Sequence, residues 1–95
     1  PEAAEQVFLA AQRAMSALAF NHAAALFEKG LSWSPARADA RAHRILLGHA
    51  LANAGRGADA AAAFLAACEG AHADEALGLR SFAAAQLLRS GLLER

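Results

Sequence analysis

The sequence predicts an all-α protein, and three of its features support that prediction. Of the 95 residues, 30 are alanine and 14 are leucine, two residues that rank high in helix propensity. The residues that favour strands are scarce, with one valine, one isoleucine and no tyrosine. Apolar residues also recur at intervals of three and four positions, in segments separated by glycine and proline.

Five helical segments follow from this pattern, over residues 3–18, 20 or 21–33, 36 or 38–53, 58–69 and 72–90. Pro35 closes the second segment because proline disfavours helix at the residue before it. Gly55 and Gly70 follow the third and fourth segments, where glycine commonly caps a helix. We expect Gly91 to stop the fifth segment in the same way.

The segments repeat along the chain. Phe27 and Phe64 are 37 positions apart, and so are Ala23 and Ala60. The predicted order is therefore helix A, helix B, helix A, helix B, helix A, in units of about 34 residues with short insertions.

These units resemble the tetratricopeptide repeat. That repeat places a Leu-Gly pair and a large residue in helix A, then Ala, Phe and Ala in helix B, then a proline. The second unit matches it at Leu47, Gly48, Leu51, Ala60, Phe64 and Ala67. The first unit matches it at Ala11, Phe20, Ala23, Phe27, Gly30 and Pro35. The tryptophan position of helix A departs from the pattern, with Val7 and Arg44, and the second unit lacks the closing proline.

Residues 55–91 show a narrower resemblance, which "AAAQLLRSG" carries most strongly. They look like the helical repeat region of large bacterial signalling proteins that carry a serine/threonine kinase domain and an AAA-type or STAND-type ATPase module. This resemblance implies a non-enzymatic protein–protein interaction or scaffolding segment of such a protein. Two alternatives stay open: a ligand- or inhibitor-sensing repeat segment of an ATP-dependent transcriptional activator, and a structural dimerisation spacer.

The resemblance also implies a partner-binding face. In this repeat family, ligands usually contact helix A side chains that point away from helix B. Those positions are Phe8, Gln12, Met15, Ile45, His49, Asn53, Ser81, Leu88 and Arg89. Their mixture of apolar and polar side chains suits a protein or peptide partner, or else neighbouring repeats of the same chain. The positions that grip a C-terminal carboxylate in some members of the family hold no lysine or arginine here, so no carboxylate clamp is expected.

Composition and spacing argue against several other functions. Nine basic and nine acidic residues balance, whereas nucleic-acid-binding domains usually have a basic excess. The four histidines lack the spacing of a metal site, and no phosphate loop, dinucleotide loop or nucleophile motif indicates a cofactor or an enzyme. We expect Arg37, Arg41 and Arg44 to form a solvated face rather than a patch for an acidic partner.

The remaining expectations concern location and assembly. A lone cysteine, Cys68, favours the cytoplasm, and we expect no signal peptide and no membrane span. The chain begins at Pro1 without methionine and stops at "GLLER", where the pattern predicts the start of a new helix, so we expect residues 1–95 to be one domain cut from a larger protein. We expect such a fragment to form a homodimer through an uncovered apolar end, at Leu79, Phe82, Leu87, Leu92 and Leu93.

Overall fold

The computed structural model describes residues 2–93, and the side chains of residues 3–91. This part of the chain contains helices and no strand. The helices are α1 (Glu2–Ser16), α2 (Phe20–Trp33), α3 (Ala40–Asn53), α4 (Gly57–Ala67) and α5 (Ala73–Leu93). Consecutive helices pack as antiparallel pairs, which confirms the predicted all-α class.

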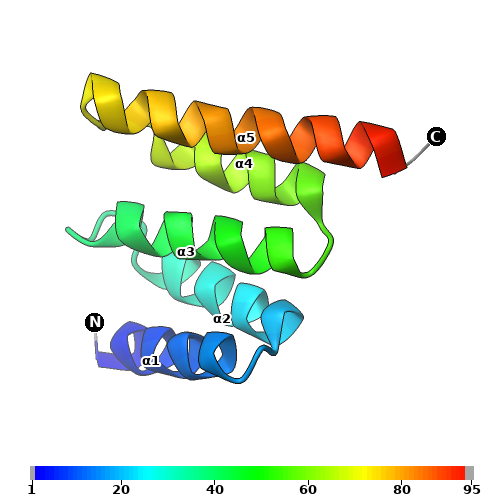
Figure 1. The fold of residues 1–95 in the computed structure, drawn as a ribbon. Coiled ribbons are helices and arrows are strands. Elements are labelled where there is room, and N and C mark those ends of the chain that lie inside the picture. The colour runs from blue at the N-terminus through cyan, green and yellow to red at the C-terminus, as the bar shows by residue number, and fades with distance from the viewer. Residues whose placement is uncertain (1, 94–95) are drawn as a thin grey trace.

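The helices form two layers (Figure 1). α1, α3 and α5 lie side by side and run in one direction, while α2 and α4 form the second layer and run in the opposite direction. Side chains join neighbours within the first layer: Phe8 of α1 stacks on His43 of α3, and His49 of α3 contacts Phe82 of α5. The first layer therefore presents one continuous face built from three parallel helices.

Left-handed backbone residues follow α1, α3 and α4. Gly55 and Gly70 have φ angles of 80° and 76°, as expected of glycines that cap helices. Leu18 has a φ of 61° although it carries a side chain. After Leu18 and after Gly55, the next amide donates to a carbonyl five positions earlier, at 2.9 and 2.8 Å. The C-terminal ends of α1 and α3 therefore both have the hydrogen bond of a Schellman motif.

The predicted start of α3 is wrong by a few residues. The helix begins at Ala40 rather than at Ala36 or Ala38. The residues after Pro35 form a turn, in which the Ala40 amide donates to the Arg37 carbonyl at 3.0 Å. This turn uses the backbone groups that a longer helix would need for its own first hydrogen bonds.

The predicted stop at Gly91 is also wrong, because α5 continues through it to Leu93. Unlike Gly55 and Gly70, Gly91 does not adopt a left-handed conformation. Glycine inside a helix costs only about 1 kcal/mol relative to alanine, so it does not end a helix by itself. No described helix, including the 21-residue α5, combines the length and apolar character needed to cross a membrane.

The core consists mainly of alanine, with phenylalanine rings between the helices. Phe27 and Phe64 are its largest fully buried side chains. Two glycines make room for rings: a Cβ on Gly48 would lie 2.6 Å from the ring of Phe64, and one on Gly30 would lie 2.6 Å from the ring of Phe8. Small side chains therefore let the helices approach closely while the rings fill the space between them.

Candidate functional site

The residues predicted to bind a partner lie on the α1–α3–α5 layer and differ in their exposure to solvent. The exposed ones are Gln12, Asn53, Ser81, Leu88 and Arg89. The partly buried ones are Met15, Ile45 and His49. Phe8 is only 3% exposed, because its ring packs on His43 and over Gly30. It therefore has no side-chain surface to offer to a partner.

Two stripes of side chains between α3 and α5 form what we call the α3–α5 face. It consists of Ile45, His49 and Asn53 on α3 and Gly78, Phe82, Ala85 and Arg89 on α5. Within each stripe the residues are three or four positions apart, so they lie on one side of their helix. The stripes meet where the rings of His49 and Phe82 contact edge to face, with centroids 5.6 Å apart.

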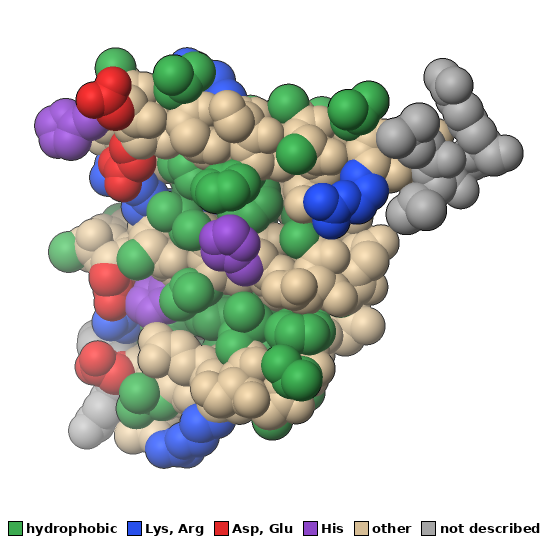
Figure 2. Space-filling view, in the orientation of Figure 1, with side chains coloured by type: hydrophobic (Ala, Val, Ile, Leu, Met, Phe, Trp, Pro, Cys, Tyr) green, Lys and Arg blue, Asp and Glu red, His purple; other side chains and the backbone are tan. Residues whose placement is uncertain are grey.

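Phe82 is the most prominent apolar side chain of the α3–α5 face. Its ring is 50% exposed, yet it is also held by Phe64, 5.5 Å away between centroids, and by His49. No atom lies within 4 Å of the place where Gly78 would carry a Cβ, so the surface of α5 is open there. Figure 2 shows apolar and histidine side chains through the middle of this side of the molecule. A ring held in place but half open to solvent is a suitable anchor for an apolar partner.

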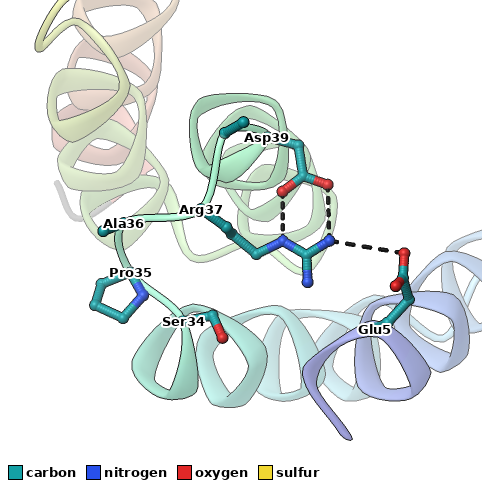
Figure 3. A pocket seen from close by; sticks show the side chains of 7 residues that line it. Glu5, Ser34, Pro35, Ala36, Arg37 and Asp39 are labelled. Carbon is teal, nitrogen blue, oxygen red and sulfur yellow. Dashed lines mark hydrogen bonds and ion pairs between the residues drawn. The ribbon is translucent and has the colours of Figure 1, made fainter. Parts of the chain in front are cut away.

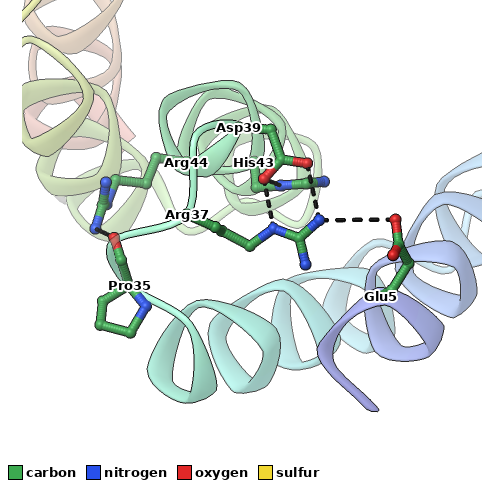
Figure 4. Close-up of polar contacts among 6 residues, drawn as sticks. All are labelled: Glu5, Pro35, Arg37, Asp39, His43 and Arg44. Carbon is green, nitrogen blue, oxygen red and sulfur yellow. Dashed lines mark hydrogen bonds and ion pairs between the residues drawn. The ribbon is translucent and has the colours of Figure 1, made fainter. Parts of the chain in front are cut away.

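An ion-pair cluster joins α1 to the start of α3 (Figure 4). Arg37 donates from Nε and Nη2 to the two carboxylate oxygens of Asp39, at 2.5 and 3.1 Å, and its Nη2 lies 3.7 Å from Glu5. The hydrogen bond from Arg37 is the main reason why the pKa of Asp39 is lowered from its ordinary value. The guanidinium of Arg37 also lies 5.0 Å from the centroid of the Phe8 ring, in a cation–π contact.

His43 is buried next to this cluster. Its ring stacks on Phe8 at a centroid distance of 3.8 Å and is tilted against Phe27 at 6.2 Å. Its Nδ1 has no hydrogen-bond partner among the described residues, although Asp39 Oδ1 lies 3.6 Å away. Sequence reasoning gave His43 no role, whereas the structure uses it to pack α1 against α3. Within the described residues, no three His, Cys, Asp or Glu side chains are grouped closely enough to hold a metal ion.

The arginines expected to form a solvated face at the start of α3 are only partly exposed, and they also contact other parts of the chain. Arg41 pairs with Glu75 at 3.4 Å and also donates to the backbone carbonyl of Glu69 at 3.4 Å. Arg44 donates to the carbonyl of Pro35 at 3.3 Å. These contacts link α3 to α5 and to the preceding turn.

Two pockets lie away from the α3–α5 face. The larger, of about 590 Å³, opens at the α2–α3 turn and is lined by Glu5, Ser34, Pro35, Ala36, Arg37, Ala38 and Asp39. Figure 3 shows that its charged side chains bind one another, with the guanidinium between the two carboxylates. The smaller, of about 330 Å³, contains a second ion pair, between Arg56 and Asp59 at 3.1 Å.

The residues expected to mediate self-association are not equally available. Leu79 is 4% exposed because it belongs to the buried core. Phe82 and Leu87 are half exposed. The side chains of Leu92 and Leu93 lie outside the described residues.

Sequence reasoning named Leu88 as a partner-binding candidate but gave no role to Leu77, a second strongly exposed leucine on α5. Leu77 and Leu88 are 64% and 68% exposed. They are eleven positions apart, which corresponds to about three helical turns, so both lie on the same side of α5. The buried residues Ala76, Leu79 and Ala83 mark the other side of the helix. The outer side of α5 is therefore apolar at two separated points.

Comparison of the chain with models of protein families, with curated proteins and with solved structures found no match.

Proposed function

We propose that this chain is a non-enzymatic protein–protein interaction module of tetratricopeptide-like helix pairs, which acts as a scaffolding segment of a larger bacterial signalling protein in the cytoplasm. The α3–α5 face is the observation that carries the proposal. It combines the half-exposed ring of Phe82, held by His49, with the open surface of α5 beside Gly78. A fixed aromatic ring next to small residues suits the apolar side chains of a protein partner.

The spacing of contacts supports the repeat part of the proposal. Phe8 and His43, which stack between α1 and α3, are 35 positions apart. Arg41 and Glu75, which pair between α3 and α5, are 34 positions apart. Contacts between equivalent helices at intervals of about 34 residues are expected when tetratricopeptide-like units are stacked.

Selection of binding peptides from a displayed library, with the 95-residue chain as bait, tests this function. The matched variants are Phe82→Glu on the α3–α5 face and Leu65→Glu on α4, since the two side chains are 50% and 48% exposed. We expect the selected peptides to bind the wild type and Leu65→Glu equally, and to bind Phe82→Glu at least about tenfold more weakly, the loss typical of an interface hot spot.

Circular dichroism melts of both variants serve as the folding control. If folded Phe82→Glu binds the selected peptides as tightly as the wild type, the α3–α5 face is not the binding surface. If the library yields no peptide that binds the wild type, the interaction function itself is contradicted.

A second candidate function is structural dimerisation, which the exposed Leu77 and Leu88 favour. Two copies that pack these leucines against each other would remove them from water. Sedimentation velocity over a wide concentration range tests this candidate: the wild type is expected to dimerise and Leu88→Glu to stay monomeric. A wild type that remains monomeric throughout contradicts it.

A further inference from the structure

We infer that the α3–α5 face receives an amphipathic helix of a partner protein, which runs antiparallel to α5 and carries carboxylates in its first turn. This inference rests on the proposed function. It adds the secondary structure, direction and charge of the partner.

The shape of the α5 stripe favours a helical partner. From Gly78 to Arg89 the stripe covers eleven positions, or about 16 Å of helix at roughly 1.5 Å per residue. The ring of Phe82 stands between two small residues, Gly78 and Ala85, so a ridge lies between two hollows. Side chains spaced three or four positions apart on a partner helix fit such an alternation, as ridges fit into grooves between packed helices.

The charges along α5 differ at its two ends. Near the start of the helix, Glu75 is already paired with Arg41 at 3.4 Å. Near the end, Arg89 is exposed, and the side chains that the structure describes give it no ion-pair partner. In Figure 2, acidic groups gather at the edge where α1, α3 and α5 begin, and a basic group lies near the other end of α5. A carboxylate of the partner is therefore stabilised most when it lies near the end of α5, beside Arg89.

The helix dipole then fixes the direction of the partner. Carboxylates stabilise a helix when they lie in its first turn. A partner helix antiparallel to α5 places its acidic first turn beside Arg89. A parallel partner would place the same carboxylates beside Asp74 and Glu75, where like charges repel.

Three synthetic peptides test the inference with the whole 95-residue chain. They share one stripe of leucines and have capped ends. The first has glutamates in its first turn and lysines in its last turn, the second has these two sets exchanged, and the third has glutamine at all of these positions. Binding to the wild type, Arg89→Glu and Arg13→Glu is measured by fluorescence anisotropy. Arg13 is the matched control, because it is an exposed arginine in the last turn of α1.

We expect the acid-first peptide to bind the wild type most tightly. Arg89→Glu should weaken it about tenfold, since an attraction becomes a repulsion, and should leave the glutamine peptide unchanged. Arg13→Glu should change neither peptide. A spin label at the start of the acid-first peptide should broaden amide signals near Arg89 and Asn53, and not those near Glu75.

The other outcomes separate this inference from the proposed function. Equal binding of all three peptides, with loss in Phe82→Glu, overturns the inferred charge and direction but leaves an interaction face. Equal weakening by Arg89→Glu and Arg13→Glu, or a spin label near Glu75, also overturns the inference alone. If none of the three peptides binds, while peptides from the displayed library bind the wild type and not Phe82→Glu, the helical partner is wrong and the interaction function stands.

Discussion

The α1–α2 and α3–α4 pairs both pack a phenylalanine ring against a glycine, but with the roles of the two helices exchanged. In the first pair α1 supplies the ring of Phe8 and α2 supplies Gly30. In the second pair α3 supplies Gly48 and α4 supplies the ring of Phe64. The difference teaches that close approach needs one large and one small residue at the contact, and that either helix can supply the large one.

The two rings also share a second role. Phe8 reaches the next helix of the first layer by stacking on His43. Phe64 contacts both His49 and Phe82, and so connects α4 to α3 and α5. Each ring therefore joins its own helix pair to the following helix.

The largest expected effect concerns the central buried ring of each helix pair. Phe27→Ala and Phe64→Ala should each cost about 3–5 kcal/mol, because both side chains are fully buried. A total stability of about 5–15 kcal/mol is usual for a domain, so either variant should be largely destabilised. Urea unfolding followed by circular dichroism measures this. A biphasic curve in Phe27→Ala would mean that the pairs unfold independently, contrary to the shared contacts described above.

The next effect concerns the two glycines under the rings. Gly48→Ala should cost about 1–3 kcal/mol, because its Cβ would lie 2.6 Å from a fully buried ring. Gly30→Ala should cost less, since its ring belongs to α1 at the edge of the stack, where the helix can shift. Gly78→Ala is the control and should gain up to about 1 kcal/mol, because it adds helix propensity in open space. Thermal melts rank the three variants, and equal losses at Gly30 and Gly48 would contradict this reasoning.

A smaller effect is expected at the two turns. Leu18 and Gly55 both have left-handed backbone angles, but only the leucine pays the steric cost of a Cβ. Leu18→Gly should therefore stabilise the chain by about 1 kcal/mol, and Gly55→Leu should destabilise it by a similar amount. Denaturant midpoints of the two variants and of the double exchange check this. A destabilised Leu18→Gly would show that the exposed leucine makes a contact that outweighs its strain.

The smallest effect is a pH dependence specific to the junction of α1 and α3. The pKa of Asp39 is lowered in the folded chain, chiefly by the hydrogen bond from Arg37. Its stabilising contribution is therefore complete above the unfolded pKa of about 3.9 and disappears as the pH falls through the folded pKa. The stability difference between wild type and Asp39→Asn should shrink as the pH is lowered below about 4. A difference that is constant across this range would mean that the carboxylate contributes no charge-dependent stability.

The sequence allowed much of the fold to be predicted, because helix propensity and punctuation are local properties. All five helices and the helix-ending glycines Gly55 and Gly70 follow from such signals. Gly91 does not end its helix, because a glycine can take either a helical or a left-handed conformation and only the surrounding contacts decide between them. Nothing in the sequence indicates the left-handed conformation of Leu18, since leucine is rarely left-handed.

The candidate site was harder to predict, because it depends on which helices become neighbours. Phe8 has the spacing of a groove residue, but the parallel packing of α1 and α3 brings it under His43. Arg41 has the spacing of a solvated stripe, but it reaches Glu75 on α5. In the sequence, His43 is one of four histidines with no recognisable spacing. In the structure, its ring contacts the rings of Phe8 and Phe27. Each of these contacts joins residues on different helices, from 16 to 35 positions apart, and a local pattern does not contain them.

The central position of α3 also has a consequence for the order in which the chain opens. α3 packs against α2 and α4 and exchanges side-chain contacts with α1 and α5, whereas α1 lies at one edge of the stack. In such a linear stack most contacts are local in sequence, so contact order is low and folding does not wait for distant ends to meet. Transient openings then begin at the edges, and amide hydrogens exchange there soonest. The amides of α3 should consequently be the last to exchange. The helix that bears His43 and His49 is then the part of the stack that opens most slowly.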